Sequence, residues 1–266
     1  MNSDFLLSSY MFSLPPELIA QEPAPVRDGS RLMILDRASG ALSLSRFADL
    51  AAHLPPGLFV INNSRVLPAR LTGQRASGGK AEFLLLTPLP LLTVRETGNG
   101  WQEAEAEGLL RDSKRLRTGE EITLGESFSL VILEKADFGR SRVRLRWKGI
   151  LEERFRNLGA LPLPPYIRRP AGEADAERYQ TLFARSEKTG SVAAPTAGLH
   201  FSEGLKEALT AAGHTWAEIT LYVGYGTFSP VRCHDIRDHG MHAEFVEISP
   251  ETAEAVNRAK AEGRAV

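Results

Sequence analysis

The chain has 266 residues, 42% of them hydrophobic and 24% charged, with a formal net charge of -1, which is typical of a globular protein with one large domain or two modest ones. Because the charge is nearly balanced, no overall field attracts nucleic acid or a membrane, and any polyanion would have to meet a local patch. The single cysteine, Cys233, excludes an intrachain disulfide and a cysteine-rich zinc site. With no basic signal-peptide segment and no apolar run of about 18 residues, the sequence predicts a cytoplasmic protein without a membrane partner.

Residues 1–68 alternate strand and helix patterns. The segment RLMILDRASGALSLSRF predicts two strands around a turn at Ser39 and Gly40, FADLAAHL a short helix, and GLFVINN a buried strand. This order indicates a mixed α/β layer.

Residues 69–150 show strand patterns only. Short strand candidates such as ARLTGQR, AEFLLLT, WQEAEAE and SRVRLRW are separated by Gly, Asn or Asp turns, as in a small barrel or sandwich. From about Leu151 helix patterns return, beginning with LEERFRNLG. We therefore predict an α/β fold in which a mixed α/β main domain, residues 1–68 and 151–266, carries an inserted small antiparallel β-barrel domain at 69–150.

Four arginines alternate with apolar or small residues in GRSRVRLRW. Strand periodicity puts Arg140, Arg142, Arg144 and Arg146 on one face. They could form a solvated outer face, or they could contact nucleic-acid phosphates. A row of like charges repels itself, and a surface that served solubility alone would mix signs.

The segment after residue 160 combines stiff and helical stretches. The prolines of LPLPPYIRRP present Tyr166 and Arg168 on an extended segment. ERYQTLFARS predicts a helix. GSVAAPTAGLHF predicts a strand that ends at Pro195 and leads into the helix SEGLKEALTAAG, with Ser202 as its N-cap.

Such a strand-to-helix turn is a candidate ligand site. Ser191 and Thr196 can hydrogen-bond a ligand, Gly198 allows close approach to the backbone, and His200 can transfer a proton. In the alternative interpretation His200 is a structural histidine and the glycine serves the turn only.

Two further patterns follow near the C-terminal end of the sequence. WAEITLYVGYGTFSPV predicts a strand followed by a turn at Gly224, Gly226 and Thr227, with no helix to favour a dinucleotide site. CHDIRDHGMHAEFVEI contains His234, His239, His242 and Glu244, which suggests either a zinc or iron hydrolase or an acid/base pair. His242 and Glu244 would point the same way from a predicted strand, which favours the acid/base pair.

Six ordered segments carry a resemblance to a known family. In order and spacing the chain resembles the S-adenosylmethionine:tRNA ribosyltransferase-isomerases of queuosine biosynthesis. The segments are LPPELIAQEPAPVRDGSRLMILDR, FVINNSRVLPARL, LPLPPYI, SVAAPTAGLHF, YVGYGTFSPV and DHGMHAEFVEIS.

The resemblance implies an enzyme and its substrates. It implies transfer and isomerisation of the ribosyl part of S-adenosylmethionine onto 7-aminomethyl-7-deazaguanine in tRNA, giving epoxyqueuosine, adenine and methionine without a metal. It also implies an α/β domain with an inserted β-barrel. Members of the family are expected to be monomers.

The resemblance also implies roles for particular residues. His200, His242 and Glu244 would be the acid/base groups, and Ser191, Thr196, Gly198, Gly224, Gly226 and Thr227 would hold S-adenosylmethionine. The remaining substrate contacts would come from Arg27, Asp28, Arg31, Asn63, Arg65, Arg70, Arg140, Arg142, Arg144 and Arg146.

The chain departs from the family pattern at its end. Family members continue past NRAKAEGRAV into a further strand, so the resemblance implies an open sheet edge here, with lower stability or a tendency to associate. Two alternatives stay open: a metal-dependent hydrolase using His234, His239, His242 and Glu244, and a tRNA-binding protein without catalytic activity.

Overall fold

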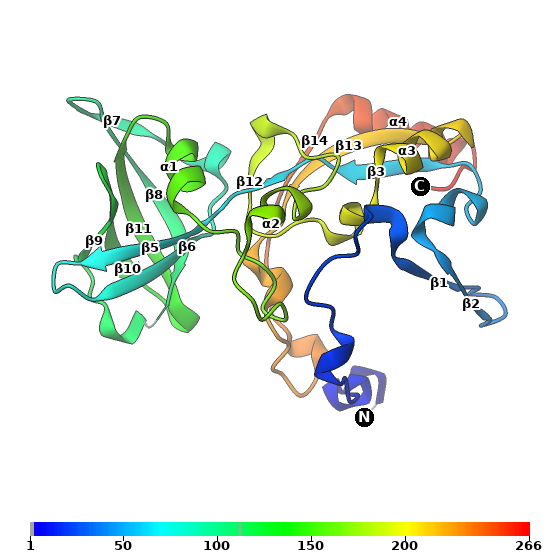
Figure 1. The fold of residues 1–266 in the computed structure, drawn as a ribbon, viewed down its shortest axis with the longest axis horizontal. Helices are drawn as coiled ribbons and strands as arrows, with labels where there is room; N and C mark the ends of the chain where they lie inside the picture. Colours follow the sequence, from blue (N-terminus) through cyan, green and yellow to red (C-terminus); the bar gives the residue numbers. More distant parts are fainter. Residues whose placement is uncertain (1–2, 112) are drawn as a thin grey trace.

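Alternating apolar residues build an antiparallel barrel from the strands between Arg70 and Lys148 (Figure 1). The computed structural model describes residues 3–111 and 113–266. Within those residues, neighbouring strands follow the order β11, β10, β9, β5, β6, β8, and β8 pairs with β11 to close the ring. β7 pairs with the first residues of β8, Trp101 to Glu103. The strands are β5 (Arg70–Arg75), β6 (Lys80–Leu85), β7 (Arg95–Gly98), β8 (Trp101–Leu110), β9 (Glu121–Gly125), β10 (Phe128–Lys135) and β11 (Arg140–Lys148).

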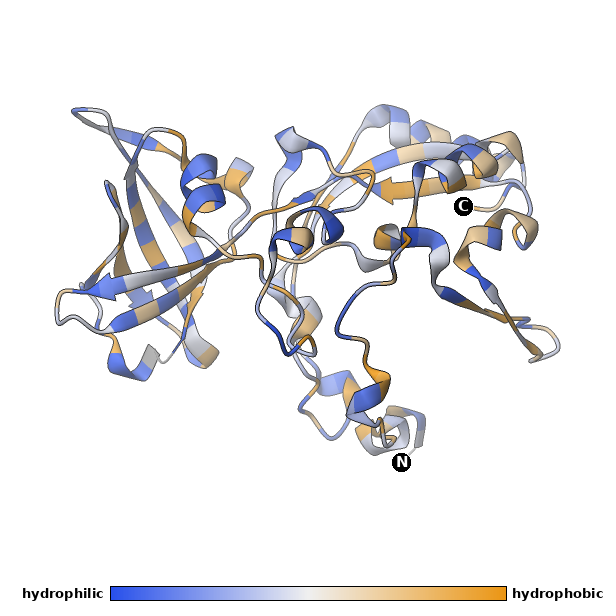
Figure 2. Cartoon of the chain, viewed as in Figure 1, coloured by the Kyte–Doolittle hydropathy of each residue, from blue (hydrophilic) through white to orange (hydrophobic). Residues whose placement is uncertain are grey.

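The barrel interior follows from strand periodicity. Along β11 exposed and buried residues alternate, so Val143, Leu145 and Trp147 face inward and are almost completely buried. Figure 2 shows this alternation of hydrophilic and hydrophobic residues along the barrel strands. Helix α1 (Leu151–Leu158) adds Phe155, whose ring meets that of Phe128 edge-on at 5.7 Å. Burial of such a ring contributes about 2–3 kcal/mol.

The rest of the chain is a mixed α/β assembly. β13 (Thr215–Tyr222) runs parallel to β3 (Leu58–Asn62) and antiparallel to β14 (Phe245–Ile248). Short β4 (Arg65–Val66) and β12 (Thr189–Ser191) pair in parallel, and β1 (Arg31–Leu35) and β2 (Leu42–Arg46) form a hairpin. The remaining helices are α2 (Glu173–Arg178), α3 (Glu203–Ala211) and α4 (Pro250–Ala261).

Two apolar clusters cover the central strands β3 and β13 of the α/β part. Phe59 stacks on Trp216 with ring centroids 4.9 Å apart, and Phe201 packs edge-on against both. On another side of the sheet, Leu58, Ala217 and Ala259 join β3 and β13 to α4. The apolar faces of the two central strands are thus covered by helices.

The predicted fold class is confirmed: a mixed α/β assembly carries an antiparallel barrel. The domain boundaries at 69 and 150 stay a prediction about folding units, although every barrel strand falls between them. The predicted N-cap is also present, because the Ser202 hydroxyl accepts a hydrogen bond from the Leu205 N–H at 3.1 Å.

Three local predictions were wrong. The helix expected over 177–186 lies earlier, at Glu173–Arg178; beyond its end, the Gln180 side chain bonds the N–H and C=O of Val66 in β4. The strand expected to reach Pro195 ends at Ser191. β14 begins only at Phe245, so His242 and Glu244 precede the strand.

The last described residues return to the central sheet. The Leu58 N–H donates to the Ala265 carbonyl at 2.9 Å, on the edge of β3 away from β13. None of the helices in the described part of the chain is long and apolar enough to cross a membrane.

Candidate functional site

A cavity of about 820 Å³ lies where the barrel meets the segment that follows β13. We call it the barrel-side cavity. The barrel contributes residues of β8 and of the β10–β11 turn, and the α/β part contributes the ends of β13 and β14 with the loop between them. Its lining includes Glu107, Phe138, Arg140, Tyr222, Gly224, Tyr225, Gly226, Arg232, His239, His242, Glu244 and Phe245.

Gly226 makes room for the imidazole of His242. A Cβ atom at Gly226 would lie 2.5 Å from the His242 Cδ2 atom, far inside van der Waals contact. The glycine is needed here because the ring rests on the bare backbone of 3-10 helix η11 (Tyr225–Phe228). His242 itself is exposed, so a ligand can reach the imidazole.

Glu244 binds the other end of the same turn. Its Oε1 atom accepts a hydrogen bond of 2.7 Å from the Gly224 N–H. His242 and Glu244 therefore converge on one Gly-Tyr-Gly turn, although neither lies in the strand that was expected to align them. An imidazole beside a fixed carboxylate is an arrangement suited to general acid/base chemistry.

Tyr222 adds a phenol to this cavity. Burial, with Glu247 nearby, raises the pKa of Tyr222 to about 12, so its hydroxyl stays protonated at neutral pH. Its hydroxyl donates to Glu247 at 3.4 Å.

A second cavity of about 820 Å³ contains His200. We call it the arginine-lined cavity because its wall includes Arg27, Arg31, Arg169 and Arg178, together with Tyr166 and Thr196. The His200 Nδ1 atom lies 3.1 Å from the Ser30 hydroxyl, and the His200 ring lies 5.2 Å from that of Phe47. No lining residue is shared with the barrel-side cavity among the described residues, so the structure does not bring His200 to His242 and Glu244.

Arg27 and Asp28 make internal contacts at the edge of this cavity. The Arg27 guanidinium donates to backbone carbonyls of Glu177, Arg178 and Leu199, and burial lowers its pKa. The Asp28 carboxylate accepts from the Ser202 hydroxyl that caps α3. Both side chains thus tie the N-terminal region to the α/β part.

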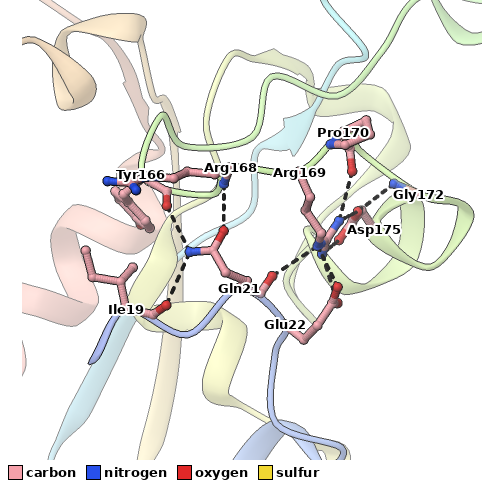
Figure 3. A network of polar contacts seen from close by, with 9 residues as sticks. All are labelled: Ile19, Gln21, Glu22, Tyr166, Arg168, Arg169, Pro170, Gly172 and Asp175. Atoms are coloured by element: carbon pink, nitrogen blue, oxygen red, sulfur yellow. Dashed lines mark hydrogen bonds and ion pairs between the residues drawn. The ribbon is translucent and has the colours of Figure 1, made fainter. Parts of the chain in front are cut away.

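A polar network fixes the proline-rich segment beside the arginine-lined cavity (Figure 3). The Gln21 side chain donates to the Tyr166 carbonyl at 3.1 Å and accepts from the Arg168 N–H at 2.6 Å. Arg169 pairs with Glu22 at 2.7 Å and with Asp175 at 2.6 Å. This hydrogen bond from Arg169 holds the pKa of Asp175 below its ordinary value of 3.8.

Several predicted site residues lie inside the fold. Ser191 is completely buried, with its hydroxyl bonded to Ser64 and to the Val223 N–H. Asn63 is 6% exposed and bonds Glu218 and Thr220. A Cβ at Gly198 would meet Thr181 at 2.9 Å, so this glycine serves internal packing. We leave these three residues out of the proposed ligand contacts.

The remaining predicted contacts are dispersed. Arg65 borders a smaller cavity of about 640 Å³, which Arg27 also reaches. Arg70 lies on β5, 4.0 Å from Glu82. Thr227 is exposed on η11 and lines neither main cavity.

The arginine row of β11 faces a row of glutamates. β8 pairs antiparallel with β11 and sets Glu107, Glu105 and Glu103 opposite Arg142, Arg144 and Arg146. Arg142 contacts Glu105 at 3.0 Å and Glu134 at 3.2 Å, while Arg146 lies 4.6 Å above the Trp101 ring. The expected unmixed cationic face is therefore a mixed-sign surface. Arg140 differs, because Leu109 lies opposite it and it borders the barrel-side cavity.

Only part of the predicted cluster of His234, His239, His242 and Glu244 lies in one cavity. His239, His242 and Glu244 line the barrel-side cavity, whereas His234 does not. In the described residues no three His, Cys, Asp or Glu side chains stand close enough together to hold a metal ion.

Sequence reasoning missed the aromatic part of the barrel-side cavity. Phe138 sits in the β10–β11 turn with a positive φ of 56°, and Arg232 lies 5.7 Å from its ring. The sequence Asp-Phe-Gly-Arg between two alternating strands indicates a hairpin turn. An aromatic residue at such a turn could have indicated that Phe138 is exposed and available for binding.

Known proteins resemble this chain along nearly its whole length. A family model described as queuosine biosynthesis protein matches residues 7–266. A protein of Nitratidesulfovibrio vulgaris (strain DP4) named S-adenosylmethionine:tRNA ribosyltransferase-isomerase is 59% identical over 272 residues, covering 99% of this chain and 73% of that relative. A protein of the same name from Oleidesulfovibrio alaskensis is 54% identical, and the match covers 99% of this chain and 69% of that relative. A crystal structure of S-adenosylmethionine tRNA ribosyltransferase from Thermotoga maritima has 27% sequence identity to this chain and a TM-score of 0.38. The match covers 98% of this chain and 67% of that chain.

Proposed function

We propose that this chain, which belongs to the queuosine biosynthesis protein family, acts as an S-adenosylmethionine:tRNA ribosyltransferase-isomerase. Its substrates would be S-adenosylmethionine and a tRNA that carries 7-aminomethyl-7-deazaguanine. The ribosyl part of S-adenosylmethionine moves to the aminomethyl nitrogen, adenine and methionine leave, and the tRNA then carries epoxyqueuosine.

One observation carries the proposal: His242 and Glu244 converge on the turn Gly224–Gly226 inside a single cavity. The reaction needs proton transfers at the substrate amine, at the carbon beside the sulfonium and at the departing adenine. An imidazole can accept and return a proton near neutral pH, which suits His242 to these steps.

The rest of the barrel-side cavity fits the two substrates in chemical terms. Carboxylates of Glu107 and Glu244 favour a sulfonium cation, while the rings of Tyr225 and Phe245 offer apolar surfaces to a purine or deazaguanine base. His200 lies in the other cavity, so we assign the proton transfers to His242 and Glu244 without it.

Adenine release tests this assignment. With the precursor tRNA, we expect His242→Ala and Glu244→Gln to lower kcat for adenine release by about a hundredfold, the usual size of an acid/base contribution. His200→Ala is the matched histidine control and is expected to retain a larger share of the activity.

Three results would contradict the proposal. Wild-type rates in both variants would remove the acid/base roles. Binding of tRNA by the unaltered chain without any adenine release would favour a non-catalytic RNA-binding protein. Activity that depends on stoichiometric zinc or iron would favour the metal-dependent alternative.

A further inference from the structure

The tip of the β10–β11 hairpin exposes an aromatic ring at a backbone position that disfavours it. Phe138 has φ 56° and ψ 27°, Gly139 has φ 83°, and the Arg140 N–H donates to the Asp137 carbonyl. These values define a type I′ turn, whose first central position favours Asn, Asp or Gly. A phenylalanine there is strained, and the residue is 87% exposed. Neither the turn nor the core therefore requires this ring.

The ring already has a cation on one side. The Arg232 guanidinium, from the segment after η11, lies 5.7 Å from the centre of the Phe138 ring. Because Phe138 as a residue is 87% exposed, its side chain remains open to another flat group. Aromatic rings flanked by arginine are effective stacking surfaces for unpaired bases.

A basic hollow of about 980 Å³ adjoins the same ring. Its charged lining is Arg111, Lys114, Arg115 and Lys135, with Asp137 as the acidic member. In the described part of the chain the side chains of Lys114 and Arg115 form no ion pair within 4 Å, in contrast to Arg142 on β11. Exposed cations without carboxylate partners are suited to phosphate groups.

Phe138 lines both the basic hollow and the barrel-side cavity. We propose that the hairpin tip binds the unpaired loop of the tRNA, with Phe138 stacked on a base and the basic hollow contacting phosphates. This inference rests on the proposed function, which supplies tRNA as the substrate. A base can be modified only when it leaves its stack with its neighbours. A neighbouring base that stacks on Phe138 at the edge of the cavity would help to keep the target base unstacked.

Binding of fluorescently labelled tRNA in the absence of S-adenosylmethionine tests the stacking contact. We expect Phe138→Asn to weaken tRNA binding roughly tenfold, as loss of one stacked base predicts. The same change relieves the turn, so Tm should stay the same or rise by about 2–4 °C. Phe138→Tyr keeps the ring and should bind tRNA as the unaltered chain does.

Salt dependence of tRNA binding tests the phosphate contacts. Lys114→Gln with Arg115→Gln should reduce the slope of log affinity against log salt by about 1.5, the value for two lost phosphate contacts. Arg37→Gln with Arg95→Gln removes the same charge from exposed positions outside the hollow and should leave the slope nearly unchanged.

The outcomes separate this inference from the proposed function. If the unaltered chain binds tRNA and releases adenine while Phe138→Asn binds equally well, the hairpin contact is wrong and the enzyme assignment stands. Equal affinity for fully duplex RNA would also overturn stacking on an unpaired base. If the unaltered chain neither binds tRNA nor releases adenine, both proposals fail.

Discussion

At the scale of single residues, the candidate site depends on two glycines, Gly224 and Gly226, which have no side chain. The Gly-Tyr-Gly turn has no Cβ at Gly226, and the His242 ring occupies that space. At Gly224 the backbone N–H, rather than a side chain, fixes the carboxylate of Glu244. The backbone of the turn thus contacts the Glu244 carboxylate, and the missing Cβ at Gly226 leaves room for the His242 ring.

Gly226→Ala is therefore expected to impair catalysis more than folding. The new methyl group must displace the imidazole, and we expect adenine release to fall about tenfold or more, since misplaced proton-transfer groups lose most of their effect. His242 is exposed, so Tm should change little. Gly204→Ala is the matched control, because open space surrounds Gly204 in α3. Unchanged adenine release in Gly226→Ala would contradict this account of the turn.

At the scale of elements, the pairing of β8 with β11 changes the meaning of the arginine row. Each strand carries charges of one sign, and only their antiparallel register brings arginines and glutamates together. Arg142 and Glu105 are each about half exposed, at 52% and 49%. An ion pair so exposed contributes little to stability, and it leaves little net charge for phosphates.

Replacing Arg142 and Glu105 together by Gln should have small effects. The net charge is unchanged, and loss of an exposed pair costs about 1 kcal/mol or less. We expect Tm to fall by no more than about 2–4 °C and tRNA affinity to stay within about twofold, since counterion release depends on unpaired cations. A large fall in tRNA affinity, measured by the same labelled-tRNA assay, would show that the row contacts phosphates.

At the scale of the whole molecule, one ionic network joins the N-terminal region to the main α/β part. Arg169 bridges Glu22 of the N-terminal segment to Asp175 of α2, and Gln21 holds the chain on either side of Ile167 (Figure 3). The arginine-lined cavity lies between these segments. The shape of that cavity therefore depends on charges that an acidic solution would remove.

The stability that Asp175 supplies should depend on pH. Its pKa lies below 3.8 in the folded chain, so the unfolded chain binds a proton there more readily. The contribution is present above about pH 4 and is lost as the pH falls through the lower, folded-state value.

Urea unfolding between pH 7 and pH 3 measures this effect. We expect Asp175→Asn to be less stable than the unaltered chain at pH 7. The difference should shrink as the pH falls below about 4, because the unfolded chain then takes up a proton at Asp175 while the folded chain still keeps the charge. The exposed Glu173→Gln in the same helix is the control. A difference that stays constant with pH would assign the effect to packing instead of charge.

His242 and Glu244 were predicted as an acid/base pair from a strand that in the structure begins only at Phe245. The sequence by itself determined the strand periodicity, the turn at Gly224 and Gly226, and the mixed α/β class with its barrel. These features depend on neighbours along the chain, such as the alternation in β11 and the glycines of the Gly-Tyr-Gly turn. Only the tertiary structure decided that His200 lies in a separate cavity, that Ser191 is buried, and that β8 glutamates face the arginine row. The exposed position of Phe138 beside Arg232 also depends on segments about ninety residues apart in the sequence. Local residue patterns specify strands and turns, but register and packing between distant segments decide which side chains share a cavity.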